Sequence, residues 1–278
     1  MKALACPLAQ RIHHERGPQL CALAQAAGQR ILHWYHTPHA DGVQLANKSD
    51  DSPLTQADLA ANECITEGLK ALTPDIPVVS EEDQASHAQR TGWNTHWLID
   101  PLDGTREFLA RNGQFTVNLA LIESGVSIWG VVHAPVSGLT YWGGAGLGAW
   151  RQDAHGTTPI QVSAVRKPAT PCRILASQSH LNDATRQFIE RVQPHVLMQA
   201  GSSLKFCQIA QGQADVYPRL GPTCEWDTAA AQAVLEGAGG TVLDLQGQPL
   251  RYNKADIFNP HFLACAPAWV DLISELCP

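Results

Sequence analysis

Three apolar runs in the middle of the chain, separated by short turn signals, constrain its fold most. The runs are of strand length and cover Phe115–Ile122, Val126–His133 and Leu139–Trp142. Ser124-Gly125 separates the first two runs, and Pro135–Gly138 separates the last two. Turns this short join antiparallel neighbours. The sequence therefore predicts an antiparallel meander here.

Helices and short strands are expected upstream of this meander. Helical periodicity covers Gln19–His33 and Thr55–Leu72, with Thr55 as a plausible N-cap. The strand-like Val78–Ser80 runs into the acidic pair Glu81-Glu82, and the strand-like His96–Ile99 ends at Asp100. Two strands thus finish in carboxylates.

The second half of the chain alternates between strand-like and helix-like segments, the rhythm of an α/β fold. These segments are Arg173–Ala176, Asp183–Val192, Val196–Met198, Ser203–Gln211, Asp215–Tyr217, Asp227–Glu236, Thr241–Leu245, Phe262–Cys265 and a closing helix at Trp269–Leu276. The polar stretch Gln152–Thr158, followed by Arg166–Pro171, is the best candidate for a boundary between lobes. We therefore expect two lobes, residues 1–158 and 159–278.

Composition excludes several classes of protein. A hydrophobic content of 44% with 16% charged residues excludes a disordered chain, and a net charge of -7 argues against a nucleic-acid-binding surface. No stretch reaches the roughly 20 apolar residues of a membrane span, and the N-terminus lacks a secretory apolar region. The eight cysteines form no C-x-x-C pair and are interpreted as buried free thiols of a cytoplasmic protein. Oligomeric state and peripheral membrane association stay open.

The segment Asp100-Pro101-Leu102-Asp103-Gly104-Thr105 places two carboxylates in one bend. Like charges about 4 Å apart repel by roughly 4 kcal/mol at an effective dielectric of 20, and a divalent cation would remove that cost. Oxygen ligands favour Mg²⁺ or Mn²⁺ over zinc, and the Leu102 carbonyl could add a third oxygen. The amides of Gly104 and Thr105 would open a helix, where free N–H groups attract phosphate.

Together with three further motifs, this turn resembles the magnesium-dependent, lithium-sensitive phosphomonoesterase superfamily, which includes inositol monophosphatases, fructose bisphosphatases and 3′-phosphoadenosine 5′-phosphate nucleotidases. The other motifs are Thr55–Asp58, Ser80–Asp83 and Glu225–Ala230, in the superfamily's order. The resemblance runs from about Gln19 to the C-terminus. It implies a two-lobe, layered α/β fold with the site in a cleft between the lobes.

The resemblance also implies roles for individual residues. The metal ligands would be Glu81, Asp100, the Leu102 carbonyl, Asp103 and Asp227, holding two or three Mg²⁺ ions. Four carboxylates balance two such ions, which leaves Asp58 free to accept a proton directly or through Thr105. Asp58 and Thr105 would orient and deprotonate the attacking water, with Glu81 sharing its orientation; the alternative for Asp58 is that it holds a third metal ion. Structural alternatives stay open: Asp227 as a helix cap, Glu81 as a solvated acid, and Asp58 as an exposed acid in a first helical turn.

The second lobe bears on the substrate, because fold and metal site do not choose a leaving group. Four of its segments resemble the bacterial 3′-phosphoadenosine 5′-phosphate nucleotidase branch: Ser177–His180, Gly201–Cys207, Ala214–Arg219 and Leu220–Pro222. Ser202, Lys205 and Arg219 offer donors suited to a second phosphate and a ribose, and His180 could contact the sugar or the 5′-phosphate. Lys205 could instead lie on a solvated helix face and Arg219 at a surface strand end. Residues 1–18 show no feature that matches the superfamily, and their role stays open.

Other patterns are weaker. Gly143–Gly148 follows a strand, but the G-x-G-x-x-G register fails at Ala149, so a hairpin loop is favoured over a dinucleotide site. His33, His36 and His39 lack ligand partners at zinc spacing. The sequence thus predicts Mg²⁺-dependent hydrolysis of 3′-phosphoadenosine 5′-phosphate to AMP and phosphate. An inositol or sugar monophosphatase and a non-catalytic nucleotide sensor are the alternatives.

Overall fold

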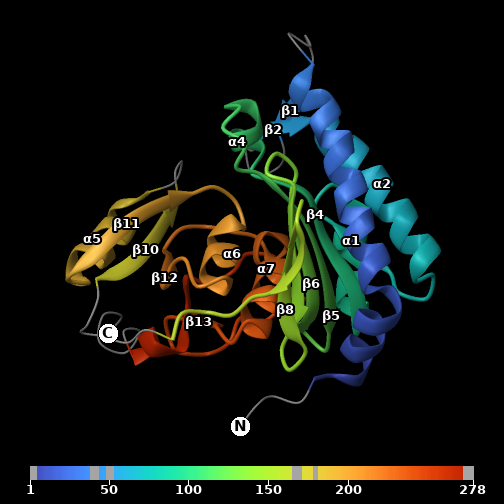
Figure 1. Ribbon diagram of the computed structural model, residues 1–278. Helices are drawn as coiled ribbons and strands as arrows, with labels where there is room; N and C mark the ends of the chain where they lie inside the picture. Colours follow the sequence, from blue (N-terminus) through green and yellow to red (C-terminus); the bar gives the residue numbers. More distant parts are fainter. Residues whose placement is uncertain (1–4, 38–43, 48–52, 165–170, 178–180, 272–278) are drawn as a thin grey trace.

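The chain stacks two large sheets and three layers of helices (Figure 1). The computed structural model describes residues 5–37, 44–47, 53–164, 171–177 and 181–271. One sheet has seven strands in the order β3-β4-β5-β6-β7-β8-β9, and the other has five in the order β11-β10-β12-β14-β13. Helices α1 and α2 cover the outer face of the larger sheet, α6 and α7 lie between the sheets, and α5 packs on the smaller sheet. This is the layered α/β fold expected from the sequence.

The first half of the chain supplies the larger sheet and its outer helices. Its elements are α1 (Pro7–His36), β1 (Gln44–Asn47), β2 (Pro53–Thr55), α2 (Gln56–Leu72), β3 (Val78–Ser80), α3 (Gln84–Gln89), η1 (Arg90–Gly92), β4 (Thr95–Asp103), α4 (Thr105–Leu109), β5 (Thr116–Glu123), β6 (Val126–Ala134), β7 (Leu139–Gly144), β8 (Gly148–Asp153) and β9 (Gly156–Pro159). Strands β4 to β9 pair antiparallel, whereas β3 runs parallel to β4. The predicted meander is confirmed.

The second half supplies the smaller sheet and the helices between the sheets. Its elements are β10 (Cys172–Ser177), α5 (Asp183–Arg191), β11 (His195–Ala200), α6 (Leu204–Ala210), β12 (Val216–Arg219), α7 (Glu225–Gly237), β13 (Thr241–Asp244), β14 (Phe262–Cys265) and η2 (Pro267–Trp269). Strands β11, β10 and β12 are parallel to one another, and β14 runs antiparallel to β12 and β13.

Strand β5 shows why the central runs are apolar throughout. Val117, Leu119 and Leu121 point into the core beneath α1 and α2. Ala120 and Ile122 point into the opposite core, against α6 and α7. Alternate side chains of a strand face opposite ways, so a sheet covered on both faces needs apolar residues at every position.

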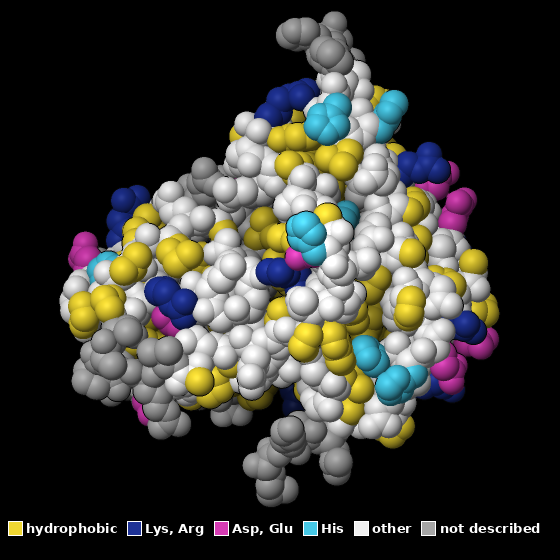
Figure 2. Space-filling model, in the orientation of Figure 1, with side chains coloured by type: hydrophobic (Ala, Val, Ile, Leu, Met, Phe, Trp, Pro, Cys, Tyr) yellow, Lys and Arg dark blue, Asp and Glu magenta, His cyan; other side chains and the backbone are white. Residues whose placement is uncertain are grey.

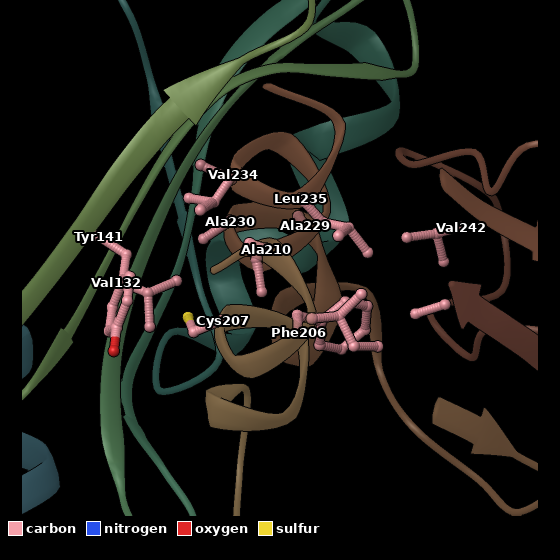
Figure 3. Close-up of a cluster of buried hydrophobic side chains, with 14 of the residues drawn as sticks. Val132, Tyr141, Phe206, Cys207, Ala210, Ala229, Ala230, Val234, Leu235 and Val242 are labelled. Atoms are coloured by element: carbon pink, nitrogen blue, oxygen red, sulfur yellow. The ribbon is translucent and has the colours of Figure 1, made fainter. Parts of the chain in front are cut away.

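The core between the sheets is built on close approach of α7 to the larger sheet (Figure 3). A Cβ at Gly130 of β6 would lie 2.3 Å from the carbonyl oxygen of Ala230, so only glycine fits there. Ser127 of β6 donates a hydrogen bond to the Ala229 carbonyl at 2.7 Å. The alanine-rich sequence of α7 is therefore a packing requirement, and it fixes where the helix begins.

Two segments are placed differently from what the sequence led us to expect. Residues Gln152–Thr158, expected at the boundary between lobes, lie in the β8–β9 hairpin, and they are polar because they form an exposed sheet edge. Helix α1 begins at Pro7, well before the expected start, because Ala9 and Ile12 are buried and extend the helix's apolar face. Most of the closing helix expected at Trp269–Leu276 lies outside the described residues. The two-lobe boundary stays a prediction, since α7 packs against both sheets.

Other expectations can be checked against the described part of the chain. Gly143–Gly148 forms the β7–β8 hairpin, as predicted. All seven cysteines in the described ranges are free, and five of them are buried. None of the described helices is both long and apolar enough to cross a bilayer.

Two buried histidines make the fold sensitive to acid. His96 of β4 and His133 of β6 are 0% and 3% exposed. Burial lowers the pKa of each to about 4, and the charge of Arg90 adds to the effect at His96. The unfolded chain, with an ordinary histidine pKa near 6.5, binds these protons first. We therefore expect the free energy of unfolding to fall as pH drops from about 6.5 to about 4, by of order 2 to 3 kcal/mol per histidine.

Urea unfolding at a series of pH values measures this loss. His96→Phe should flatten the acid-side decline because it removes one of the two groups. The exposed His14 provides a matched control, and His14→Phe should leave the slope unchanged. An equal pH slope in the wild type and His96→Phe would show that His96 does not contribute.

Candidate active site

A cleft of about 700 Å³ opens between the two sheets, where β4, α4, α6, β12 and the start of α7 meet. All but two of the residues that the sequence marks for the site line it. They are Glu81, Asp100, Leu102, Asp103, Gly104, Thr105, Ser202, Lys205, Arg219 and Asp227. Asp58 lies behind Thr105, and His180 lies outside the described residues. Figure 2 shows one face of the molecule, on which charged side chains are scattered and gather in no large patch.

The turn after β4 carries two of the acids. The register between β4 and β5 shifts between Asp100 and Asp103, so the strand bulges and both residues reach the cleft. Asp100 accepts a hydrogen bond from the Leu102 amide at 3.0 Å. Gly104 then adopts a φ of 93°, the left-handed conformation that favours glycine, and lets α4 start immediately. The sequence D-P-L-D-G-T thus encodes the turn itself.

Asp103 is held by donors from β5 of the larger sheet and from the turn before α6. One carboxylate oxygen accepts hydrogen bonds from the Ser203 amide at 2.7 Å, the Asn118 side chain at 3.3 Å and the Thr116 hydroxyl at 3.4 Å. Burial raises the pKa of Asp103 to about 6, although the charge of Lys205 opposes this rise. The acid is therefore fixed in place but short of compensating positive charge.

Lys205 is buried rather than on a solvated helix face, which excludes that alternative. Lys205 is 4% exposed, and its ammonium donates to the carbonyls of Ser202 at 2.6 Å and Ala200 at 3.3 Å. The nitrogen also lies 5.1 Å from the centre of the Tyr217 ring. Burial lowers the pKa of Lys205 to about 8, so most of its charge is present at pH 7.

Asp227 both caps a helix and faces the cleft. It is the third residue of α7, and its Oδ2 accepts the Cys224 amide at 2.9 Å. Burial raises its pKa well above the ordinary value, and repulsion from Asp103 and Glu81 adds to the effect. The capping alternative and the site role therefore coexist. Glu81 follows β3 and is only partly exposed on the cleft wall.

Asp58 is completely buried, so the exposed-acid alternative is excluded. It forms a capping box with Thr55 at the start of α2: Asp58 accepts the Thr55 amide at 2.9 Å, and the Thr55 hydroxyl accepts the Asp58 amide at 3.4 Å. The Thr105 hydroxyl oxygen lies 3.5 Å from Asp58 Oδ1 and 3.4 Å from the Leu102 carbonyl oxygen. Thr105 therefore connects the buried Asp58 carboxylate to the cleft.

The donor set suits a hard divalent cation. Every expected ligand is an oxygen, and burial, together with repulsion from other acids, raises the pKa of Asp103 and Asp227, an effect that a bound divalent cation would offset. As they stand, no three His, Cys, Asp or Glu side chains in the described ranges are grouped to hold a metal, and this covers His33 and His36 but not His39. Asp103 and Asp227 each accept a backbone amide through Oδ2, and the second carboxylate oxygen of each can bind an ion.

The remaining expected residues differ in how they are held. Arg219 donates to the Pro222 carbonyl at 2.6 Å and lines the cleft, so it is not a free strand end. Ser202 adopts a φ of 43° directly before α6 and faces Gly104 across the cleft. Sequence reasoning missed Ser203, Thr116 and Asn118, which position Asp103. A polar Asn118 within an otherwise apolar strand was the available signal.

Comparison with known proteins agrees with this geometry. Residues 14–273 match the Inositol monophosphatase family. The chain is 46% identical to the 3′(2′),5′-bisphosphate nucleotidase CysQ of Salmonella typhimurium, over 88% of this chain and 97% of that protein. The CysQ structure from Bacteroides thetaiotaomicron aligns with a TM-score of 0.78 and 37% identity, covering 91% and 98% of the two chains.

A second solved structure, the extragenic suppressor protein suhB from Bartonella henselae, aligns with a TM-score of 0.75 at 25% identity, covering 92% of this chain and 95% of that one. The matched residues include every expected ligand and the whole cleft. The chain therefore belongs to the Inositol monophosphatase family, whose members are metal-dependent phosphatases.

Proposed function

We propose that this protein removes the 3′-phosphate of 3′-phosphoadenosine 5′-phosphate, giving AMP and phosphate. The observation that carries the proposal is one cleft in which acids from separate motifs face Lys205 and Arg219. The acids suit the metal ions that a phosphatase of this family uses. The positively charged Lys205 and Arg219 suit a substrate with a second phosphate. Relatives that are 45–46% identical over 88% of this chain are named 3′(2′),5′-bisphosphate nucleotidases.

The acids of the cleft hold Mg²⁺, two or three ions in number, through Glu81, Asp100, the Leu102 carbonyl, Asp103 and Asp227. Bound Mg²⁺ supplies Lewis-acid stabilisation of the charge that develops on the phosphate and on the departing oxygen. Each ligand comes from an element whose backbone is itself fixed, which keeps the oxygens ready for the reaction.

Asp58 and Thr105 handle the proton. The Thr105 hydroxyl lies between Asp58 and the cleft, so it can accept a hydrogen bond from the attacking water while donating its own proton to Asp58. The water oxygen then bonds to phosphorus as the bond to the ribose 3′-oxygen breaks. The departing oxygen takes a proton from solvent water in the open cleft to become the 3′-hydroxyl of AMP, and Asp58 afterwards releases its proton to solvent. Glu81 shares the orientation of the water.

Other residues of the cleft bind the phosphates and the ribose of the nucleotide. Gly104 and Thr105 present amides to the 3′-phosphate, whereas Ser202, Lys205 and Arg219 bind the second phosphate and the ribose. His180 joins them at the sugar or the 5′-phosphate. We further propose inhibition by lithium, a cytoplasmic location, and removal of a by-product of sulfate assimilation.

Substrate comparison tests the proposal most directly. Phosphate release should be faster from 3′-phosphoadenosine 5′-phosphate than from inositol 1-phosphate, as measured by kcat/KM with Mg²⁺. A preference for inositol 1-phosphate would overturn the substrate assignment, and tight nucleotide binding without phosphate release would indicate a sensor instead.

Arg219 should account for part of that preference. Arg219→Ala removes a charged donor, so we expect kcat/KM for 3′-phosphoadenosine 5′-phosphate to fall by about 10- to 100-fold, the effect of losing one charge-assisted hydrogen bond. Because 3′-AMP lacks the 5′-phosphate, its kcat/KM should change much less. Equal losses on both substrates would place Arg219 at the reacting phosphate or in the fold.

Removing a ligand carboxylate should stop turnover while leaving the fold intact. Asp103→Asn should lower kcat/KM by at least about 100-fold, because a group that binds the ion directly counts for more than those that orient it. Glu190→Gln, which removes an exposed acid on α5, is the charge-matched control and should retain activity. Unchanged turnover in Asp103→Asn, with a normal thermal midpoint, would contradict the ligand role.

A further inference from the structure

His87 on the short helix α3 contacts the residues that precede two of the cleft acids. Its Nε2 lies 2.6 Å from the backbone carbonyl oxygen of Ser80, and Ser80 directly precedes Glu81. The carbonyl oxygen can only accept, so Nε2 carries the proton and donates it. The other contact of His87 is with Trp226: the two rings stack with centres 4.9 Å apart and planes inclined by 20°. Trp226 directly precedes Asp227.

A second set of contacts holds α3 to the same end of α7. Arg90, which is 6% exposed, donates to the carbonyl of His87 at 2.6 Å and to those of Lys254 and Ala255 at 2.6 and 3.0 Å. Glu225, which is 1% exposed, accepts the amides of Asn253 and Lys254 at 2.8 and 3.0 Å.

Together these contacts link α3, the start of α7 and the loop at residues 253–254 to one another. His87 contacts Trp226, the neighbouring Glu225 binds the loop at residues 253–254, and Arg90 ties that loop back to His87. None of the four side chains, His87, Arg90, Glu225 and Trp226, lines the cleft. This set of contacts nevertheless joins the end of β3 to the start of α7, the two elements next to which Glu81 and Asp227 lie.

We propose that His87 is a positioning residue for the ion site, holding Glu81 and Asp227 at the separation needed to share a cation. Glu81 and Asp227 repel each other, and a contact that ties the end of β3 to the start of α7 opposes that repulsion. His87 supplies the restraint because its imidazole contacts the Ser80 carbonyl, next to Glu81, and the Trp226 ring, next to Asp227, at the same time. The inference rests on the proposed function only in taking the cleft to bind divalent cations.

Two substitutions separate the contacts of His87. His87→Phe keeps a ring to stack on Trp226 but loses the donor to Ser80, and His87→Gln keeps a donor but loses the ring. His87→Ala loses both. The control is His13→Ala, since His13 makes an equivalent stack on Trp150, with ring centres 4.7 Å apart, and lines a separate pocket beneath α1.

The primary readout is Mn²⁺ binding to the ion-free protein by calorimetry, without substrate. We expect the dissociation constant to rise about tenfold in His87→Ala, with smaller increases in His87→Phe and His87→Gln, and no change in His13→Ala. The Mg²⁺ concentration for half-maximal turnover should rise in parallel, while kcat at saturating Mg²⁺ stays near the wild-type value.

Each other outcome overturns a definite statement. A lower thermal midpoint in His87→Ala with unchanged Mn²⁺ affinity would make His87 a purely structural residue. Unaltered affinity with an unaltered midpoint would also overturn the inference. A wild-type chain that binds Mn²⁺ but does not hydrolyse 3′-phosphoadenosine 5′-phosphate would defeat the proposed function and leave the role of His87 intact, whereas a wild-type chain that binds no Mn²⁺ would defeat both.

Discussion

Repulsion between buried carboxylates is the constraint on which the rest of this structure depends. Burial raises the pKa of both Asp103 and Asp227, and repulsion adds to it, from Glu107 at Asp103 and from Asp103 and Glu81 at Asp227. Each is nevertheless fixed by a backbone amide at a helix start: Ser203 precedes α6 and Cys224 precedes α7. Helix N-termini carry partial positive charge, so the two helices stabilise the acids before any ion arrives. The position of α6 and α7 between the sheets therefore determines where Asp103 and Asp227 are stabilised.

That position depends on small residues far from the cleft. Gly130 lets β6 approach the backbone of Ala230, and a Cβ at Gly237 would lie 2.4 Å from the Gly148 carbonyl oxygen. A larger residue at either place would push α7 away from the larger sheet and move Asp227 with it. Packing of α7 and placement of its first-turn acid are thus one requirement, which explains why the alanine-rich segment directly follows the acidic motif.

Local features of the sequence predicted the local features of the site. The turn that carries Asp100 and Asp103, the cap at Thr55 and the central strands follow from residue types within a few positions of one another. The contact between Asp103 and Ser203 joins residues 100 positions apart, and no local pattern encodes it. The burial of Lys205 was missed for the same reason, since Tyr217 and the Ala200 carbonyl surround it only after the smaller sheet has formed. The hairpin formed by β8 and β9 was not predicted, because the polar composition of Gln152–Thr158 does not distinguish an exposed sheet edge from a connection.

The cleft has two walls of different origin, and this bears on how one fold serves several substrates. Glu81, Asp100 and Asp103 come from strands of the larger sheet, whereas Lys205 and Arg219 come from α6 and from β12 of the smaller sheet. Proteins that share only about a quarter of the sequence, including the suhB protein, keep the whole architecture. Under the proposed function, the fold would keep the ion site on one wall while substitutions on the other wall change the group that is recognised. Asp227 lies between the two walls, so a change that shifts α7 would alter ion binding and substrate binding together, whereas a change confined to α6 or β12 would alter substrate binding alone.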